Sequence, residues 1–167
     1  ISNNDLAASN YTITYVGADL TITKANLTVT ADAKTKVYGT ADPALTYKVT
    51  GLVNNDAATV VTGTLKRAAG ENVGTYAISN NDLAASNYLI TYAGANLTIT
   101  KATITGITLS DASFTYDAAA KSILISGTLP AGTTVSYTGN NQTAAGTYTV
   151  TANIDGGINY TNLSLQA

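Results

Sequence analysis

The sequence predicts a mainly β protein made of tandem small β-rich units, and both composition and residue pattern indicate this. Of 167 residues, 30 are Thr, 11 are Tyr and 14 are Gly, whereas Cys, His, Met and Trp are absent. Thr, Tyr, Val and Ile favour pleated strands, and straight-chain helix formers are scarce. Apolar residues and Thr also alternate along short segments such as 20–23 and 97–100, which is the period of a half-buried strand.

An internal repeat indicates how the chain is organised. Residues 1–24 and 78–101 are identical at 21 of 24 positions, with an offset of 77 residues. The sequence therefore predicts a complete unit over residues 25–101 and identifies residues 1–24 as C-terminal strands of a preceding repeat. The first residues lack the basic start and apolar run of a secretory signal, so we expect a piece of a longer or processed chain.

The last part of the chain is a more distant copy of the same unit. Gly146-Thr147-Tyr148 and Asn159-Tyr160 have the spacing of Gly74-Thr75-Tyr76 and Asn87-Tyr88, with the two tyrosines twelve positions apart in each case. This register predicts a second-variety unit over residues 102–167 that lacks its final strand, which would begin at about residue 169.

One segment of the complete unit departs from the strand pattern. Asn55–Thr62 has an N-cap candidate in Asn55, two Ala residues and a following Gly, which predicts a short helix of about two turns. We therefore expect a β-grasp-like unit in which this helix packs on a sheet. A small antiparallel sandwich is the alternative fold, and it is the one predicted for residues 102–167.

Two sets of motifs resemble the MBG-type repeats of bacterial surface proteins. The Tyr-Gly variety is represented by Val37-Tyr38-Gly39, Asp42–Tyr47, Gly51-Leu52, Asp56, Gly63, Gly74–Tyr76, Asn87-Tyr88 and Leu97–Ile99. The Tyr-Asp-Gly variety is represented by Phe114–Asp117, Leu129–Gly132, Val135–Tyr137, Ala145–Tyr148 and Asn159-Tyr160, with Ala118 in place of the usual Gly. The resemblance implies a structural stalk or spacer segment of a secreted adhesin or matrix protein. The family's name suggests mucin or glycan binding as the alternative, but it defines no binding residue.

Charge and hydropathy exclude two classes of partner. The formal charge is −2 with 11% charged residues and no run of Lys or Arg, so nothing would neutralise the phosphates of a nucleic acid. Apolar stretches reach only four or five residues, which is too short for membrane insertion. A Cys-free, Thr- and Asn-rich, weakly acidic chain fits an extracellular bacterial surface or secreted matrix, and the cytosol is the alternative location.

The sequence predicts no enzyme and no catalytic residue. Nucleophilic or general-base catalysis through His or Cys is impossible because neither is present. The carboxylates lie beside turn-forming residues, where a short acceptor side chain binds nearby backbone N–H groups. These residues are Asp5, Asp32, Asp42, Asp56, Asp82, Asp111, Asp117 and Asp155.

No metal or cofactor site is predicted either. Asn80-Asn81-Asp82 and its copy Asn3-Asn4-Asp5 offer oxygen ligands for calcium, but their spacing matches no EF-hand and each has one carboxylate. We favour plain loops for both.

Tyrosines and lysines carry the remaining hypotheses. Tyr11, Tyr15, Tyr88 and Tyr92 occupy alternating strand positions that favour core packing, and a sugar-stacking face is the alternative. Lys24, Lys48 or Lys101 is available for an isopeptide cross-link to Asn, although no partners are singled out.

The expected partners are neighbouring repeats of the same chain and host or matrix glycans, together with other copies through strand addition. In the last case Leu20–Thr23 of one copy would fill the place that follows Ala167 in another. We favour the alternative, in which the sequence is a window on a continuous array and the cut ends do not pair between copies.

Overall fold

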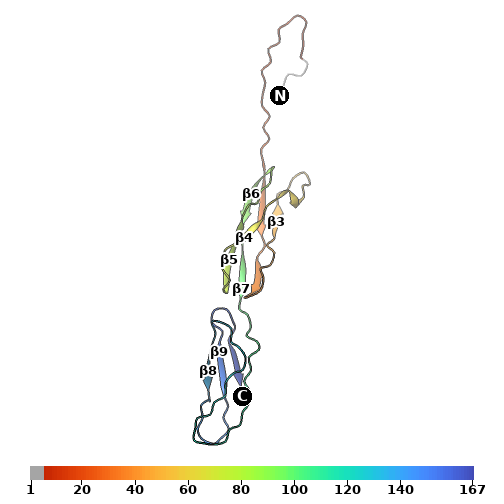
Figure 1. Cartoon of the computed structure of the whole chain (residues 1–167). Helices are drawn as coiled ribbons and strands as arrows, with labels where there is room; N and C mark the ends of the chain where they lie inside the picture. The colour runs from red at the N-terminus through yellow and green to blue at the C-terminus, as the bar shows by residue number, and fades with distance from the viewer. Residues whose placement is uncertain (1–5) are drawn as a thin grey trace.

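The computed structural model describes residues 6–167 and has an elongated shape, with its units following one another along one axis (Figure 1). The prediction of a mainly β fold is confirmed. The strands are β1 (Ala25–Ala31), β2 (Lys34–Val37), β3 (Tyr47–Thr50), β4 (Leu65–Arg67), β5 (Gly74–Asn80), β6 (Tyr88–Ala93), β7 (Ala95–Thr100), β8 (Thr134–Thr138), β9 (Thr151–Asp155) and β10 (Leu163–Gln166), and one 3₁₀ turn is η1 (Ala58–Val60). Within residues 6–167 no helix is long and apolar enough to cross a membrane.

Residues 25–101, called the central unit below, are organised around two long extended segments that run in parallel. β1 leads into β2 after two residues, and β6 leads into β7 after Gly94. β1 pairs in parallel with β6, and β2 pairs in parallel with β7. The sheet orders are β3-β1-β6 and β2-β7-β5-β4, so the first extended segment (β1 and β2) lies beside the last one (β6 and β7) in both sheets.

The core of the central unit follows directly from the alternation in the sequence. Along β1, Leu27 and Val29 are buried whereas the intervening Thr side chains face solvent, because successive side chains of a strand point to opposite faces. Leu27 and Val29 pack with Val61, Ala85 and Tyr88, and a second cluster joins Ala31, Ile78 and Leu97.

The helix predicted over Asn55–Thr62 is wrong in extent, because only the single 3₁₀ turn η1 forms. Asn54 and Asn55 have positive φ angles of 54° and 58°, so the chain turns where an N-cap was expected. The residue that caps η1, Ala57, makes no side-chain capping hydrogen bond. Val61 is then drawn into the core, and Thr62 forms a bridge to Ala84, so tertiary packing favours an extended backbone over a second turn.

The last unit, residues 102–167, contains one three-stranded antiparallel sheet in the order β10-β9-β8. Ile104, Ile107 and Ile154 form its core. Two isolated bridges, Thr108–Ser126 and Lys121–Gln142, join other segments of this unit. Within the described chain, the sandwich predicted from the sequence therefore has one regular sheet, and its second layer has isolated bridges in place of a ladder.

Residues 6–24, called the arm below, project beyond the central unit (Figure 1). Their sequence nearly repeats that of β6 and β7, yet no residue from 6 to 24 is assigned to a strand. Leu20 and Ile22 are 79% and 88% exposed, whereas their counterparts Leu97 and Ile99 are 0% and 1% exposed. The difference arises because β7 lies between β2 and β5, and the arm has no such neighbours in this structure.

Candidate functional site

In the described part of the chain, the carboxylates do not gather into a group that could hold a metal ion. Residues 6–167 contain no group of three or more His, Cys, Asp or Glu side chains placed to hold a metal ion. Asp117 and Asp155 accept hydrogen bonds from backbone N–H groups two residues further on, as expected of turn residues. Asp32 and Asp56 instead accept from the hydroxyls of Thr46 and Tyr88. Asp111 borders a groove described below, and Asp5 lies outside the described residues.

The loop proposed as a calcium ligand set is tied to its own unit. Asp82 Oδ1 accepts from the backbone N–H of Thr64 at 2.6 Å and from its hydroxyl at 2.8 Å. The Thr64 backbone N–H, followed by its hydroxyl, lowers the pKa of Asp82. Asn80 Oδ1 accepts from the N–H of Leu83 at 2.8 Å. These oxygens therefore stabilise the loop beside β4 and β5. The copy at residues 3–5 lies outside the described residues.

The junction between the central and last units is the first candidate site. β7 ends at Thr100, and only Lys101 separates it from Ala102, which already forms a parallel bridge with Tyr160. Ala102 donates its N–H to the carbonyl of Asn159 at 2.9 Å and accepts from the N–H of Thr161 at 2.9 Å. The chain therefore crosses from one unit into the next as a single extended segment.

The same construction occurs at the start of the central unit. The arm runs through Lys24 into β1, and Ala25 donates its N–H to the carbonyl of Asn87 at 3.0 Å. Asn87 has the sequence position that Asn159 has in the last unit. The parallel ladder of β1 with β6 begins at Ala25 and Tyr88, the counterpart of the Ala102–Tyr160 bridge. One entry geometry thus serves both units.

Side chains reinforce the junction. The amide of Asn159 accepts from the N–H of Val73 at 2.9 Å and donates to Asn72 Oδ1 at 2.9 Å. The rings of Tyr38 and Tyr160 meet edge to face, with centroids 5.5 Å apart. Lys101 Nζ, one of the three lysines considered for cross-linking, donates to the carbonyl of Gly157 at 2.7 Å. The two units therefore contact each other through backbone, amide and aromatic groups.

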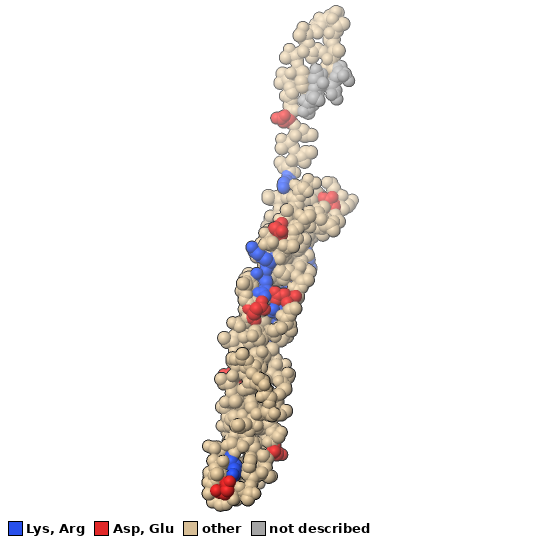
Figure 2. Space-filling model, viewed as in Figure 1, with Lys and Arg blue, Asp and Glu red and all other residues tan. Residues whose placement is uncertain are grey.

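A second candidate site is a network of four charged side chains in the middle of the central unit (Figure 2). Lys36 Nζ lies 2.6 Å from Asp42 and 2.7 Å from Glu71, and Arg67 Nε lies 2.6 Å from Asp42. Arg67 also pairs with Glu71 and lies over the ring of Tyr76. The Lys36 side chain is 4% exposed, and a charge buried in this way needs compensation. The carboxylates of Asp42 and Glu71 provide it.

The sequence interpretation missed this network. Arg67 and Glu71 are the only Arg and the only Glu of the chain and lie four residues apart, which is a signal of pairing that could have been used. Lys36 and Asp42 could not be found this way, because the fold of the intervening chain brings them to the other pair. The surrounding contacts make this a structural cluster that ties β2 to β4.

The network predicts an acid-sensitive contribution to stability. Hydrogen bonds from Arg67 and then from Lys36 lower the pKa of Asp42 from 3.8 to about 2. Because the pKa is lower in the folded chain than in the unfolded one, the contribution is complete above about pH 4 and is lost as the pH falls towards about 2. We expect the difference in Tm between the unmodified chain and Asp42→Asn to shrink over this range, as measured by circular dichroism. A difference in Tm that stays constant between about pH 5 and about pH 2 would contradict this assignment.

The tyrosines of the strands divide between the core and the surface. Tyr88 is 3% exposed and donates its hydroxyl to Asp56 Oδ2 at 2.6 Å, and this hydrogen bond is the main cause of its raised pKa. Tyr92 donates to the carbonyl of Ile78 at 3.0 Å, and burial raises its pKa. The core placement predicted for these two is confirmed. The core placement predicted for Tyr11 and Tyr15 is wrong in this structure, where they are 81% and 38% exposed because the arm carries no packed strands.

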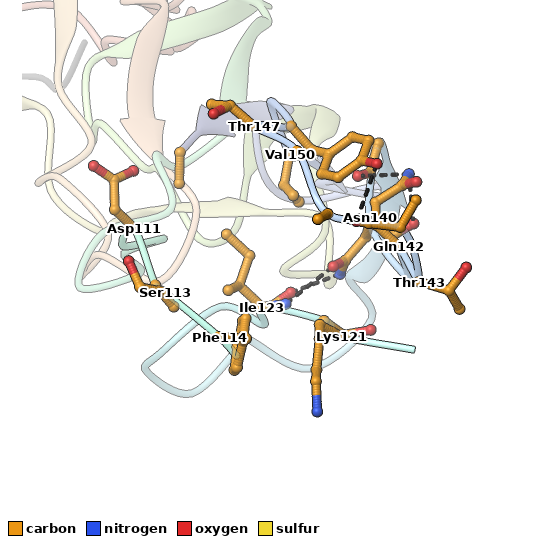
Figure 3. A pocket seen from close by; sticks show the side chains of 18 of the residues that line it. Asp111, Ser113, Phe114, Lys121, Ile123, Asn140, Gln142, Thr143, Thr147 and Val150 are labelled. Carbon is orange, nitrogen blue, oxygen red and sulfur yellow. Dashed lines mark hydrogen bonds between the residues drawn. The ribbon is translucent and has the colours of Figure 1, made fainter. Parts of the chain in front are cut away.

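A groove of about 520 Å³ runs along the last unit (Figure 3). Residues 111–116 form one wall, residues 146–150 form the other, and Ala167 borders it. Phe114 and Tyr148 line it and are 54% and 40% exposed. Asn140 also lines the groove, and its side-chain amide accepts from the N–H of Ile123 at 3.0 Å and donates to the carbonyl of Ile123 at 2.6 Å.

Comparison with known families gives a match over part of the chain. Residues 27–98 match the family of the MBG domain (YGX type). This confirms the predicted MBG-type repeat for that segment, which contains both core clusters of the central unit. No curated protein matches the chain, and no solved structure matches it. The predicted boundaries at residues 24 and 101 stay a prediction.

Proposed function

We propose, from the premise that residues 27–98 are an MBG domain of the YGX type, that the chain is a non-catalytic stalk segment of an extracellular bacterial adhesin or matrix protein. The resemblance to MBG-type repeats implies an adhesin-like extracellular protein, and the match over residues 27–98 supports this proposal. Serial units of this kind would hold a terminal functional part away from the cell surface or build a matrix.

The observation that carries this proposal is the direct passage of strands between units. A flexible linker would let neighbouring units reorient, but here Lys101 alone separates β7 from the parallel bridge of Ala102. The contacts of Asn159 and Tyr160 with the central unit add lateral support. Thirteen extended residues from 25 to 37 span about 40 Å, so each 77-residue repeat would lengthen a stalk by about that distance.

The strand arrangement also suits a protein under tension. The chain enters the central unit at β1 and leaves it at β7, and both belong to the parallel central pair. Pulling on the two ends therefore loads six paired positions of β1 with β6 and four of β2 with β7 in shear. Hydrogen bonds loaded in shear must break together, whereas a peeled hairpin loses them one at a time.

Single-molecule force spectroscopy tests the stalk function. We expect a concatemer of the 167-residue chain, pulled through its ends, to unfold in a regular sawtooth. Unfolding of one 77-residue unit should release roughly 220 Å, its extended length less its folded length. A single irregular event, or extension without measurable resistance, would contradict the proposal.

A change of pulling direction provides the matched control. Lys66 and Ser79 face each other across β4 and β5, and the chain has no Cys of its own. Handles attached through Lys66→Cys and Ser79→Cys would peel this hairpin and should open it at a lower force than that needed through the ends. Equal forces in the two directions would show that the parallel pair does not resist tension.

Glycan binding, the alternative function, has less support in the central unit. A sugar platform needs several exposed rings on one face, and the rings of Tyr88 and Tyr92 are instead packed among apolar side chains. Exposed aromatic rings do border the groove of the last unit.

A further inference from the structure

The edge strands of the central unit are β2, β3, β4 and β6, and β6 differs from the other three. β2, β3 and β4 have three or four residues each, and every one of them carries Lys or Arg. β6, with the sequence YLITYA, has six residues and no charge. Short edges with basic side chains resist pairing with another strand, so β6 is the edge of this unit that lacks such protection. All four edges lie within the matched residues 27–98, so this difference belongs to the domain itself.

The backbone along the outer side of β6 is unpaired in the described chain. The ladder with β1 starts where Ala25 donates its N–H to the carbonyl of Asn87, and a parallel ladder then uses every second residue of β6. The intervening residues Tyr88, Ile90 and Tyr92 therefore direct their N–H and C=O groups away from β1. No strand of the described chain pairs on that side, so these groups are open to an added strand.

The side chains of β6 are also those of an open edge. Leu27 and Val29 of β1 are 1% and 0% exposed, whereas Ile90 and Tyr92, which pack against the same core cluster, are only partly buried. On the opposite face of the strand, Leu89 is 61% exposed. A strand added beside β6 would cover these groups, just as β3 and β6 cover the two sides of β1.

The chemistry of β6 favours a second copy of the same strand as its neighbour. Antiparallel pairing around a two-fold axis at Ile90 places Ile90 opposite its own copy and Tyr88 opposite Tyr92 as hydrogen-bonded pairs, which uses all of the open groups. Leu89 then lies opposite Thr91 in the pairs between them. Neither strand carries a charge that pairing would have to desolvate, and no like charges meet.

We propose that the open edge of β6 is a contact between copies of this chain, in which β6 of one copy pairs antiparallel with β6 of a second copy. The strands run along the long axis of the molecule, so the two copies lie side by side and point in opposite directions (Figure 1). Residues 11–16 match β6 at four of six positions and are also uncharged, so the neutral strand recurs with the 77-residue repeat. Chains with the same spacing can pair at several units at once, which strengthens a contact that is weak singly.

This inference goes beyond the stalk function and does not depend on it. The force experiment loads the ladder between β1 and β6 inside one copy, whereas the contact between copies uses the other side of β6. A chain that resists force without pairing, and a chain that pairs without resisting force, are therefore distinguishable.

Disulfide trapping tests the register, because the chain has no Cys of its own. In the proposed contact Leu89 and Thr91 form a non-hydrogen-bonded pair with Cα atoms about 4.5 Å apart, which suits a disulfide. Two copies of Leu89, or two of Thr91, lie on a diagonal at about 7–8 Å, which is too far for a bridge without backbone movement. An oxidised equimolar mixture of Leu89→Cys and Thr91→Cys chains should therefore give mainly the mixed dimer. A yield of mixed dimer no higher than chance overturns the proposal.

The edge strand β2 provides the matched control. Thr35 and Val37 are exposed, lie two residues apart and have Lys34 and Lys36 beside them. An oxidised mixture of Thr35→Cys and Val37→Cys chains should give about tenfold less dimer than the β6 pair, because the basic side chains oppose pairing. Equal yields on the two edges would show that the dimers arise from random collision, which overturns the proposal.

Exchange of charge tests the contact without a covalent bond. In sedimentation experiments the unmodified chain should dimerise with a Kd between about 10 μM and about 1 mM. A variant with Leu89→Lys and Thr91→Lys, and one with Leu89→Glu and Thr91→Glu, change only exposed side chains. Each places like charges opposite one another and should associate at least about tenfold more weakly, whereas a mixture of the two should associate as well as the unmodified chain.

Three results of the sedimentation experiments overturn the proposal. The first is an unmodified chain that stays monomeric up to about 1 mM. The second is a charged variant that associates as strongly as the unmodified chain, since the contact then lies elsewhere. The third is a mixture of the two charged variants that stays monomeric.

Discussion

Replacing Leu97 by Ala should lower the free energy of unfolding of the central unit by about 2–5 kcal/mol, because the side chain is fully buried beside Ala31 and Ile78. The chain supplies its own control. Leu20 has the same neighbours on its C-terminal side, Thr-Ile-Thr-Lys, but lies in the arm with 79% exposure. Leu20→Ala should therefore change stability by less than about 0.5 kcal/mol.

Hydrogen exchange is the suitable measurement for this pair, because it resolves the central unit from the last one. Amides of β5 and β7 should lose protection in Leu97→Ala and keep it in Leu20→Ala. Comparable losses in the two variants would mean that the arm also packs into a core in solution.

Replacing Gly63 by Ala should destabilise the central unit by about 2–5 kcal/mol, for two reasons that add. Gly63 has a φ angle of +93°, which L side chains rarely adopt. An added Cβ would also overlap the carbonyl oxygen of Asp82 and lie 2.7 Å from its carbonyl carbon. The backbone of Asp82 cannot shift freely to make room, because the backbone N–H of Thr64 donates a hydrogen bond to the Asp82 side chain.

Gly39→Ala separates the two causes. Gly39 has a similar φ angle of +80°, but nothing lies within 4 Å of the position of an added Cβ. Its substitution should cost about 1–2 kcal/mol, which is the backbone strain alone. Urea unfolding monitored by circular dichroism measures both variants. If Gly39→Ala is as destabilising as Gly63→Ala, the close approach to Asp82 has no energetic weight.

Several elements of the fold could be predicted from local sequence. The alternation along residues 27–31 determines which side chains of β1 are buried, because a strand places successive side chains on opposite faces. The repeat with a period of 77 residues and the Tyr-Gly motifs indicated an MBG-type unit, and the match over residues 27–98 confirms it. Helix prediction failed at residues 55–62, where the core position of Val61 outweighed local propensity.

The candidate sites were less accessible to sequence reasoning. The junction depends on Asn159 meeting Asn72 and Val73, which are far away in the chain, and the charged network depends on Lys36 and Arg67 being brought together by the sheet. The register of the last unit predicted that its final strand lies beyond residue 167, but the residues that line the groove were found only in the tertiary structure. No local pattern reports such contacts, because they are set by sheet order.

Taken alone, the sequence determined the β class, the repeat and the absence of His and Cys chemistry, since these are properties of composition and period. Only the tertiary structure decided which copy of one strand sequence is folded. Leu97-Thr98-Ile99-Thr100 is buried and Leu20-Thr21-Ile22-Thr23 is exposed, although the residues are the same. The physical reason is that a strand gains its backbone hydrogen bonds and its apolar contacts from neighbouring strands, and β2 and β5 provide them to β7 alone.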